Sequence, residues 1–214
     1  MINDNVNNLS QNWRDLMFRE SFFLFVTLIV TMICSLSLAG DFIIGLKAFK
    51  KQDYATAYEE FISLANTGDI RAQTYIGMMH FNGLSVPRNF EIAAKWYGQA
   101  AEKGHPHAQF HLGWMYDNGK GLEKNKNLAF HWLESAALQG HPRAQNNLGA
   151  MYFRGEGVEK DILLAQMWYM ISASKGMVEA TENLNGLKGS LSSKQMSVVK
   201  EMVKKCLTSN YSDC

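Results

Sequence analysis

Three histidines lie close together near the middle of the chain and are the residues best placed for metal chemistry. His107 and His111 are four residues apart on an expected helix, a spacing that can present two imidazoles to one metal ion. The intervening residues do not supply the glutamate of a His-Glu-x-x-His motif, and the sequence fixes no third ligand. His105 fits a turn between helices, as His141 does later in the chain. We therefore expect no metal site and no cofactor.

Motifs for covalent or phosphate chemistry are missing from the sequence. It contains no nucleophile elbow, no Walker loop and no C-x-x-C pair. The glycines on either side of Lys120 lack the strand and phosphate loop of a nucleotide site, and the positive φ that such turns require explains them. We therefore expect no catalytic residues and no enzymatic activity.

The composition is that of an ordinary globular protein. The chain has 214 residues, 47% of them hydrophobic, with 21 Lys and Arg against 20 Asp and Glu and a formal net charge of +1. That length allows one extended or two compact domains. Because no basic patch or arm stands out, we expect no nucleic-acid binding.

Residues 1–39 are expected to form a signal peptide or an N-terminal membrane anchor. The stretch Phe22–Ala39 carries no charge and follows two arginines. Small residues at Ser37 and at the end of the stretch suit cleavage before Gly40, although a start at Met17 is an alternative. Cleavage predicts a periplasmic or secreted protein. Retention of residues 22–39 predicts inner-membrane anchoring with the remaining chain facing the periplasm.

Cys206 and Cys214 are the cysteines that an exported chain would keep. An even number outside the cytoplasm indicates a disulfide. Closing a loop of about nine residues would contribute about 2 to 3 kcal/mol through the unfolded state. The alternative is two free thiols on a frayed tail.

A repeat of 36 residues dominates the chain. The recurring columns are Ala72, Ala108, Ala144 and Ala180; Gly77, Gly113 and Gly149; Gly83, Gly119 and Gly155; Ala93, Ala129 and Ala165; Trp96, Trp132 and Trp168; and Gly68, Gly104, Gly140 and Gly176. Each unit reads as a helix (helix A), a glycine turn and a second helix (helix B) closed by a glycine. One hairpin cannot bury its own apolar face, so we expect neighbouring hairpins to stack into an all-α solenoid. The strict period of the tryptophans favours core packing over a stacking platform for bases or sugars.

These columns resemble the Sel1-like repeat family. The family's pattern is met by Ala144–Val158 (AQNNLGAMYFRGEGV), followed by Ala165, Trp168, Ala173 and Gly176. The first unit departs most, with Ser85 in place of a turn glycine and His80 in place of a tyrosine. The resemblance implies an α-α superhelix of tetratricopeptide-like hairpins, with helix A lining a concave groove.

The resemblance also organises the chain into domains. We expect a tetratricopeptide-like hairpin over residues 40–68 with a tight turn near Gln52-Asp53, and Sel1-like repeats over residues 69–188. The repeat units are 69–104, 105–140, 141–176 and a partial 177–188. Residues 189–214 are expected to form a C-terminal capping helix, opened by a capping box at Ser192, and the disulfide tail.

One side of helix A varies between repeats, and we expect it to face the ligand. The candidate groove residues are Arg71, Thr74, Met78, Phe81, His107, Phe110, Trp114, Asp117, Arg143, Asn146, Ala150 and Phe153. The large apolar groups among them are expected to be mostly exposed, which would mark a partner site. Burial against adjacent hairpins is the alternative.

The sequence therefore predicts a non-enzymatic module that binds a protein or peptide partner in its groove. Two alternatives remain. Some secreted, cysteine-rich Sel1-like proteins resembling this chain bind or hydrolyse β-lactams, but they carry a cysteine pair in each repeat that is absent here. An inner-membrane-anchored assembly or regulatory factor would differ only in keeping residues 22–39.

Overall fold

The computed structural model describes residues 42–214, which consist of helices and turns without a β-strand. The expected signal peptide or anchor, the alternative start at Met17 and the predicted cleavage site lie outside the described residues. No helix within 42–214 has the length and apolar character needed to cross a membrane. The chain divides into two compact units, one ending at Glu60 and the other running from Phe61 to Cys214.

The described part of the first unit contains a helix over residues 42–50 and the beginning of α2 (Tyr54–Asn66). Gln52 lies between the helices with a φ of +63°, in the left-handed region. The rings of Phe49 and Tyr54 meet edge to face, with their centroids 5.2 Å apart. The turn therefore falls where the sequence predicts it.

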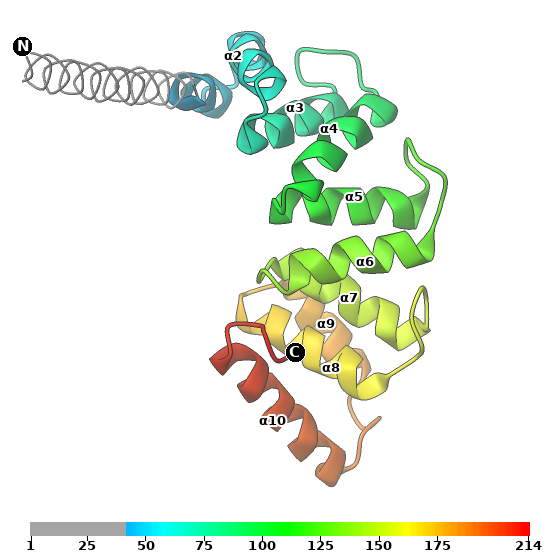
Figure 1. Cartoon of the computed structure of the whole chain (residues 1–214). Helices are drawn as coiled ribbons and strands as arrows, with labels where there is room; N and C mark the ends of the chain where they lie inside the picture. Colours follow the sequence, from blue (N-terminus) through cyan, green and yellow to red (C-terminus); the bar gives the residue numbers. More distant parts are fainter. Residues whose placement is uncertain (1–41) are drawn as a thin grey trace, which may run out of the picture. The chain divides into compact units, whose positions relative to one another are not determined.

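The second unit contains three helical hairpins in sequence order (Figure 1). They are α3 (Ile70–Asn82) with α4 (Phe90–Glu102), α5 (Pro106–Asn118) with α6 (Lys126–Ala137), and α7 (Pro142–Arg154) with α8 (Ile162–Ser174). Two further helices follow, α9 (Val178–Gly186) and α10 (Ser193–Thr208), and both pack on α8. Each helix B (α4, α6) also packs on the helix A of the next hairpin. The predicted all-α repeat array is confirmed.

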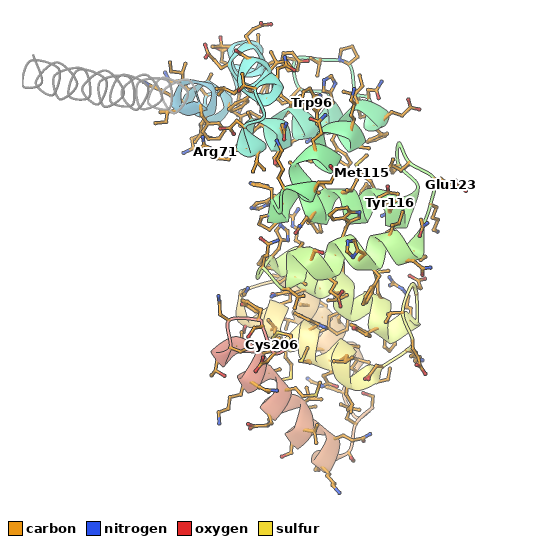
Figure 2. All side chains as sticks on the ribbon, in the orientation of Figure 1. Arg71, Trp96, Met115, Tyr116, Glu123 and Cys206 are labelled. Atoms are coloured by element: carbon orange, nitrogen blue, oxygen red, sulfur yellow. A yellow bond between two sulfur atoms is a disulfide. The ribbon has the colours of Figure 1, made fainter. Side chains whose placement is uncertain are left out.

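Recurring glycines allow helices A and B of one hairpin to approach closely. A Cβ atom on Gly77 would lie 2.9 Å from the ring of Tyr97, and one on Gly149 would lie 2.9 Å from the ring of Tyr169. Both tyrosines are buried. Met115 is fully buried in the middle hairpin (Figure 2). The glycine column therefore sets the packing distance that the hairpin core requires.

In the first two repeats the tryptophans are less deeply buried than the residues that follow them, Tyr97 and Leu133. Trp168 is 3% exposed, whereas Trp96 and Trp132 are half-buried. Trp168 belongs to the core formed by α6, α7, α8 and α10 together with Phe110 of α5, and Trp132 packs at the edge of the preceding core. Core packing of the column is confirmed fully only at Trp168.

The turn between helices A and B keeps one backbone conformation in all three repeats. Gly121 and Gly157 have φ values of +70° and +73°, and a side chain at Gly121 would collide with the backbone of Phe90. Ser85 occupies the equivalent position of the first repeat and has a φ of +60°. The first repeat therefore retains the left-handed turn despite lacking the glycine.

A column of buried glutamines, which our sequence analysis did not single out, ties each helix A to the helix before it. The side-chain amides of Gln73, Gln109 and Gln145 donate to the backbone carbonyls eight residues earlier, at 3.2, 3.2 and 3.0 Å. These carbonyls lie near the C-terminal ends of α2, α4 and α6, where helices leave carbonyl groups unpaired. The signal was present in the sequence as a further column with the same 36-residue spacing.

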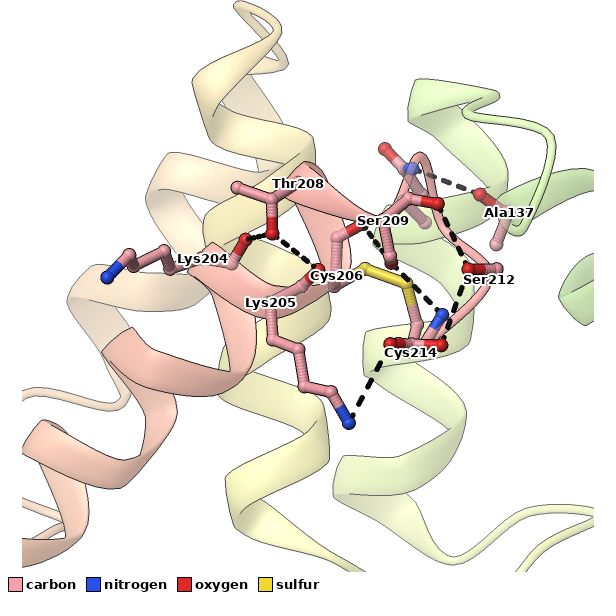
Figure 3. Close-up of a disulfide and its surroundings, with 10 residues drawn as sticks. Ala137, Lys204, Lys205, Cys206, Thr208, Ser209, Ser212 and Cys214 are labelled. Atoms are coloured by element: carbon pink, nitrogen blue, oxygen red, sulfur yellow. Dashed lines mark hydrogen bonds and ion pairs between the residues drawn. A yellow bond between two sulfur atoms is a disulfide. The ribbon is translucent and has the colours of Figure 1, made fainter.

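The C-terminal helix α10 begins with the predicted capping box, formed by Ser192 and Gln195. Val199 and Cys206 are buried on its inner face as part of the core that α8 shares. Cys206 forms a disulfide with Cys214, with the Cα atoms 4.7 Å apart, which confirms the predicted pairing (Figure 3). The backbone N–H of Tyr211 donates to the Cys206 carbonyl at 2.8 Å and helps close the tail.

Candidate functional site

Polar residues that we predicted to face a ligand instead connect neighbouring repeats. The Thr74 hydroxyl lies 3.1 Å from Nδ1 of His105, and Thr74 is buried. The Asn146 side-chain oxygen accepts from the amide of Asn183 at 2.9 Å. These pairs join residues 31 and 37 positions apart, so part of this face of helix A forms the seam between repeats.

The apolar residues of the predicted groove follow the same pattern. Phe110 is 7% exposed and stacks on the imidazole of His141, with the ring centroids 4.7 Å apart. Phe81 is half-buried and meets Trp114 edge to face at 5.5 Å. The expectation that these large groups are mostly exposed is therefore wrong, because side chains of the next repeat contact them.

The remaining residues of the predicted groove differ in how exposed they are. Met78 is half-buried, whereas Phe153, on the last helix A, is 39% exposed. Asp117 is also engaged, since the Lys126 ammonium bridges it at 2.5 Å and Glu156 at 2.8 Å. Arg71, His107 and Arg143 are the charged or titratable members of the predicted set that remain exposed; Ala150 is half-buried.

Two of these exposed residues line a pocket of about 320 Å³ built by successive repeats. Its walls come from α5, from the start of α7 and from the turn that precedes α9. The lining residues are His107, Phe110, His111, His141, Pro142, Arg143, Lys175, Gly176 and Met177. No Asp or Glu is among them. We call this the third-repeat pocket, because His141 and Arg143 open the third repeat.

Hydrogen-bond partners assign the protons on the two histidines that meet in the third-repeat pocket. The backbone N–H of Ala144 donates to Nδ1 of His141 at 3.3 Å, so the proton of a neutral His141 is on Nε2. That atom lies 3.1 Å from Nδ1 of His107 and donates to it. The proton of His107 is then on Nε2, and His107 is exposed. The pair therefore offers an N–H donor to a ligand.

Burial and positive neighbours keep the inner histidines of this pocket neutral at pH 7. Burial lowers the pKa of His141 to about 3, aided by the positive charges of His107, His111, Arg143 and Lys175. The pKa of His111 is lowered to about 4, again mainly by burial, with His107 and Arg143 adding to the effect. At pH 7 the permanent positive charges of this pocket are therefore those of Arg143 and Lys175, beside neutral inner histidines.

An equivalent pocket, of about 550 Å³, lies two repeats earlier at the start of α3. Its walls include Asp69, Arg71 and Lys103, which precede His141, Arg143 and Lys175 by 72 residues each. We call it the first-repeat pocket. Its Lys103 ammonium donates to the Gly68 carbonyl at 3.0 Å, as the Lys175 ammonium does to the Gly140 carbonyl at 2.5 Å. The backbone and the lysine contact are therefore shared by the two pockets.

The two pockets differ in one carboxylate. Asp69 accepts hydrogen bonds from the backbone N–H groups of Arg71 and Ala72, both at 2.9 Å, and pairs with the Arg71 guanidinium at 2.9 Å (Figure 2 labels Arg71). Burial raises the pKa of Asp69, but these bonds outweigh it and the pKa is lowered. In the third-repeat pocket His141 replaces this aspartate, and no carboxylate within residues 42–214 pairs with Arg143.

The histidine cluster does not form a metal centre with other ligands of the described residues. His105 and His107 have ring centroids 5.9 Å apart, and His105 pairs with Thr74 rather than with the other imidazoles. Across residues 42–214, no group of three or more His, Cys, Asp and Glu side chains is arranged to hold a metal ion.

Comparison with known proteins identifies the family. The Sel1 repeat model matches residues 70–105, 106–141 and 142–177. A Sel1 repeat protein from Oxalobacter formigenes is 41% identical, with a TM-score of 0.55, over 60% of this chain and 96% of that one. A protective antigen of uropathogenic Escherichia coli strains, c5321, described as having an SLR fold, is 32% identical, with a TM-score of 0.67.

The match to the E. coli antigen covers 70% of this chain and 33% of that one, so this chain spans about a third of its length. No curated protein matches the sequence. The three matched units coincide, within one residue, with the repeats expected from the sequence. The chain belongs to the Sel1 repeat family.

Proposed function

We propose that the chain is a non-enzymatic scaffold that binds a protein or peptide segment on the helix A side of its repeats. Sel1 repeats typically mediate protein interactions. The observation that best supports binding on this side is the third-repeat pocket, which three successive structural units build around exposed His107 and Arg143. A rigid stack can hold such groups at fixed spacing, so that little ordering of the scaffold opposes binding.

The proposed surface is smaller than the groove expected from the sequence. It includes the third-repeat pocket and extends along α7 to Phe153, the large apolar member of the predicted set that is most exposed. Thr74 is excluded because it is buried, and Phe110, which is also buried, contributes only to the wall of the third-repeat pocket. Met78, Phe81 and Trp114 are half-buried and can contribute only the edges of their side chains.

We place this interaction outside the cytoplasm. The Cys206–Cys214 disulfide fits an oxidising compartment, since glutathione and thioredoxin keep most cytosolic thiols reduced. A periplasmic or secreted protein agrees with cleavage after residue 39. Retention of residues 22–39 would instead hold the repeats at the periplasmic face of the inner membrane. The partner is a protein or peptide, and no nucleic acid is proposed.

Site-specific photocrosslinking in the native cell tests this proposal. A benzophenone amino acid replaces Phe153 in one full-length variant and Leu128, on α6, in the other. Both residues are 39% exposed, so the two probes are matched in accessibility. Irradiation followed by mass spectrometry identifies the proteins that each probe reaches.

We expect a defined protein to crosslink to position 153 and not to position 128. Crosslinks to the same proteins at both positions would mean that binding does not use the helix A side. The absence of crosslinks at position 153, with both variants expressed and helical by circular dichroism, would contradict binding at this surface.

A further inference from the structure

The third-repeat pocket has the chemistry of a carboxylate site. We propose that it binds a carboxylate of the partner segment, supplied by an acidic side chain or by a free C-terminus. This inference rests on the proposed function and adds to it the chemical group that the partner must present at one defined point of the scaffold.

Several hydrogen-bond donors of the pocket have no acceptor among residues 42–214. The Arg143 guanidinium is exposed, carries five N–H donors and pairs with no carboxylate of residues 42–214. Nε2 of His107 carries the second donor, as assigned above. Lys175 uses one of its three donors on the Gly140 carbonyl. A group that only accepts hydrogen bonds, such as a carboxylate, therefore complements this set.

The protein itself shows how a carboxylate occupies this place in a repeat. In the first-repeat pocket the Asp69 carboxylate lies between the Arg71 guanidinium and the first amides of α3, each at 2.9 Å. The third-repeat pocket keeps the arginine and the lysine at the same spacing and has His141 instead of the aspartate. The ligand carboxylate would provide to Arg143 the negative charge that Asp69 provides to Arg71.

The helix that follows the pocket adds to this complementarity. Met177, in the pocket wall, is the N-cap of α9 and gives that helix no side-chain acceptor. The first N–H groups of a helix are unpaired within the helix and favour negative charge. Occupation by an anion would also offset the positive charges of Arg143 and Lys175, which add to the effect of burial in lowering the pKa of His141.

Titration of the full-length chain with small carboxylates, followed by NMR, tests the proposal. N-acetylglycine represents a C-terminal carboxylate, N-acetylglutamate α-amide represents an acidic side chain, and N-acetylglycinamide is the neutral control. The observed signals are the Nε–H group of Arg143 and the imidazole of His107. Arg143→Gln removes the proposed anchor, and Arg71→Gln is the matched control because Arg71 already has Asp69.

We expect saturable shifts with a millimolar dissociation constant, weakened at least tenfold by Arg143→Gln and unchanged by Arg71→Gln. The tighter of the two acids indicates whether the partner supplies a C-terminus or a side chain, and either result supports the proposal. Equal binding of the neutral amide, tighter binding of inorganic phosphate, or unchanged affinity in Arg143→Gln would overturn it.

Failure of this inference is distinguishable from failure of the proposed function. Crosslinking from position 153 without any carboxylate binding would leave a partner-binding scaffold whose partner does not use the pocket in this way. Carboxylate binding without a crosslinked protein would instead contradict the proposed function alone.

Discussion

The starts of α3 and α7 occupy equivalent places in the repeat, yet their charges are arranged differently. At α3, Asp69 and Arg71 neutralise each other, whereas at α7 a neutral His141 accompanies Arg143, which no described carboxylate pairs. The surrounding backbone and the buried glutamines are the same in both. Repeated positions therefore build the scaffold, while one unrepeated residue, Asp69 or His141, changes how the neighbouring arginine is paired.

The largest expected effect on stability comes from substituting the glycines at which helices A and B approach closely in both repeats. Gly77→Ala and Gly149→Ala should each lower the free energy of unfolding by about 2 to 3 kcal/mol, because the new methyl group meets a buried tyrosine ring in both. Gly98→Ala is the control, since nothing lies within 4 Å of the added atom. Urea denaturation measures all three. A large difference between the first two would show that the hairpins are not packed equivalently.

The disulfide should stabilise the fold by holding the C-terminal tail, which contacts Lys175 of the third-repeat pocket. The ring of Tyr211 lies under the Lys175 ammonium, 4.6 Å from it, and the disulfide holds the tail that carries this tyrosine. Cys214→Ser should lower the free energy of unfolding by about 2 kcal/mol through the lost loop constraint. A reducing agent should destabilise the unaltered protein and leave the variant unchanged. Equal sensitivity of both to the reductant would contradict this role.

Acidification should destabilise the third repeat more than the first. The pKa of His141 is lowered to about 3 in the folded protein, so the unfolded state binds the additional proton as pH falls below about 6.5. The contribution of His141 to stability is therefore fully present above that pH. Toward pH 4 the free energy of unfolding decreases by on the order of 1 to 2 kcal/mol. The pKa of Asp69 is lowered, so the stability that its carboxylate contributes is lost only as pH falls below about 3.8, outside this range.

Hydrogen exchange at pH 7 and pH 5, corrected for the intrinsic rate, can locate this effect. Amides of α7 should lose more protection at the lower pH than amides of α3, because burial lowers the pKa of His80, on α3, less than it lowers that of His141. The reverse order, or equal loss in both helices, would mean that the inner histidines do not control the acid sensitivity.

Exchanging the residues that distinguish the repeats should have a smaller effect on stability. His141→Asp should raise the free energy of unfolding by about 1 kcal/mol, because an aspartate N-cap pairs with the first amides of α7 and with Arg143. Asp69→His should lower it by a similar amount. Thermal unfolding measures both variants. If His141→Asp is destabilising, α7 does not accept the arrangement seen at α3.

Periodicity in the sequence predicted most of the fold. The spacing of Gly77 and Gly149, the helix-closing glycines and the capping box at Ser192 all lie where the sequence placed them. These residues act through local geometry or through one hairpin, and such effects follow from the spacing of residue types. The disulfide followed from its two cysteines in the same way.

The environment of the proposed binding face was predicted less well, because it depends on the next repeat. A helical wheel places Phe110 on the variable side of its helix, but it cannot show that His141 of the following repeat stacks on it. The pocket joins residues from three units, and whether a carboxylate pairs with Arg143, as Asp69 does with Arg71, depends on the side chains that these units bring together. The spacing of residues predicts the structure within one repeat, whereas the pocket is formed by residues of several repeats.

Acetate titration of the unaltered protein and of Asp69→Ala tests the central claim that the third repeat takes from a ligand the carboxylate that the first repeat supplies itself. NMR signals of the Arg71 and Arg143 guanidinium groups report on the two pockets separately. In the unaltered protein, we predict that acetate shifts the Arg143 signal saturably and leaves Arg71 unmoved; in Asp69→Ala, both should respond. An unmoved Arg143 in both proteins, or an Arg71 that stays silent after its aspartate is removed, would contradict the account.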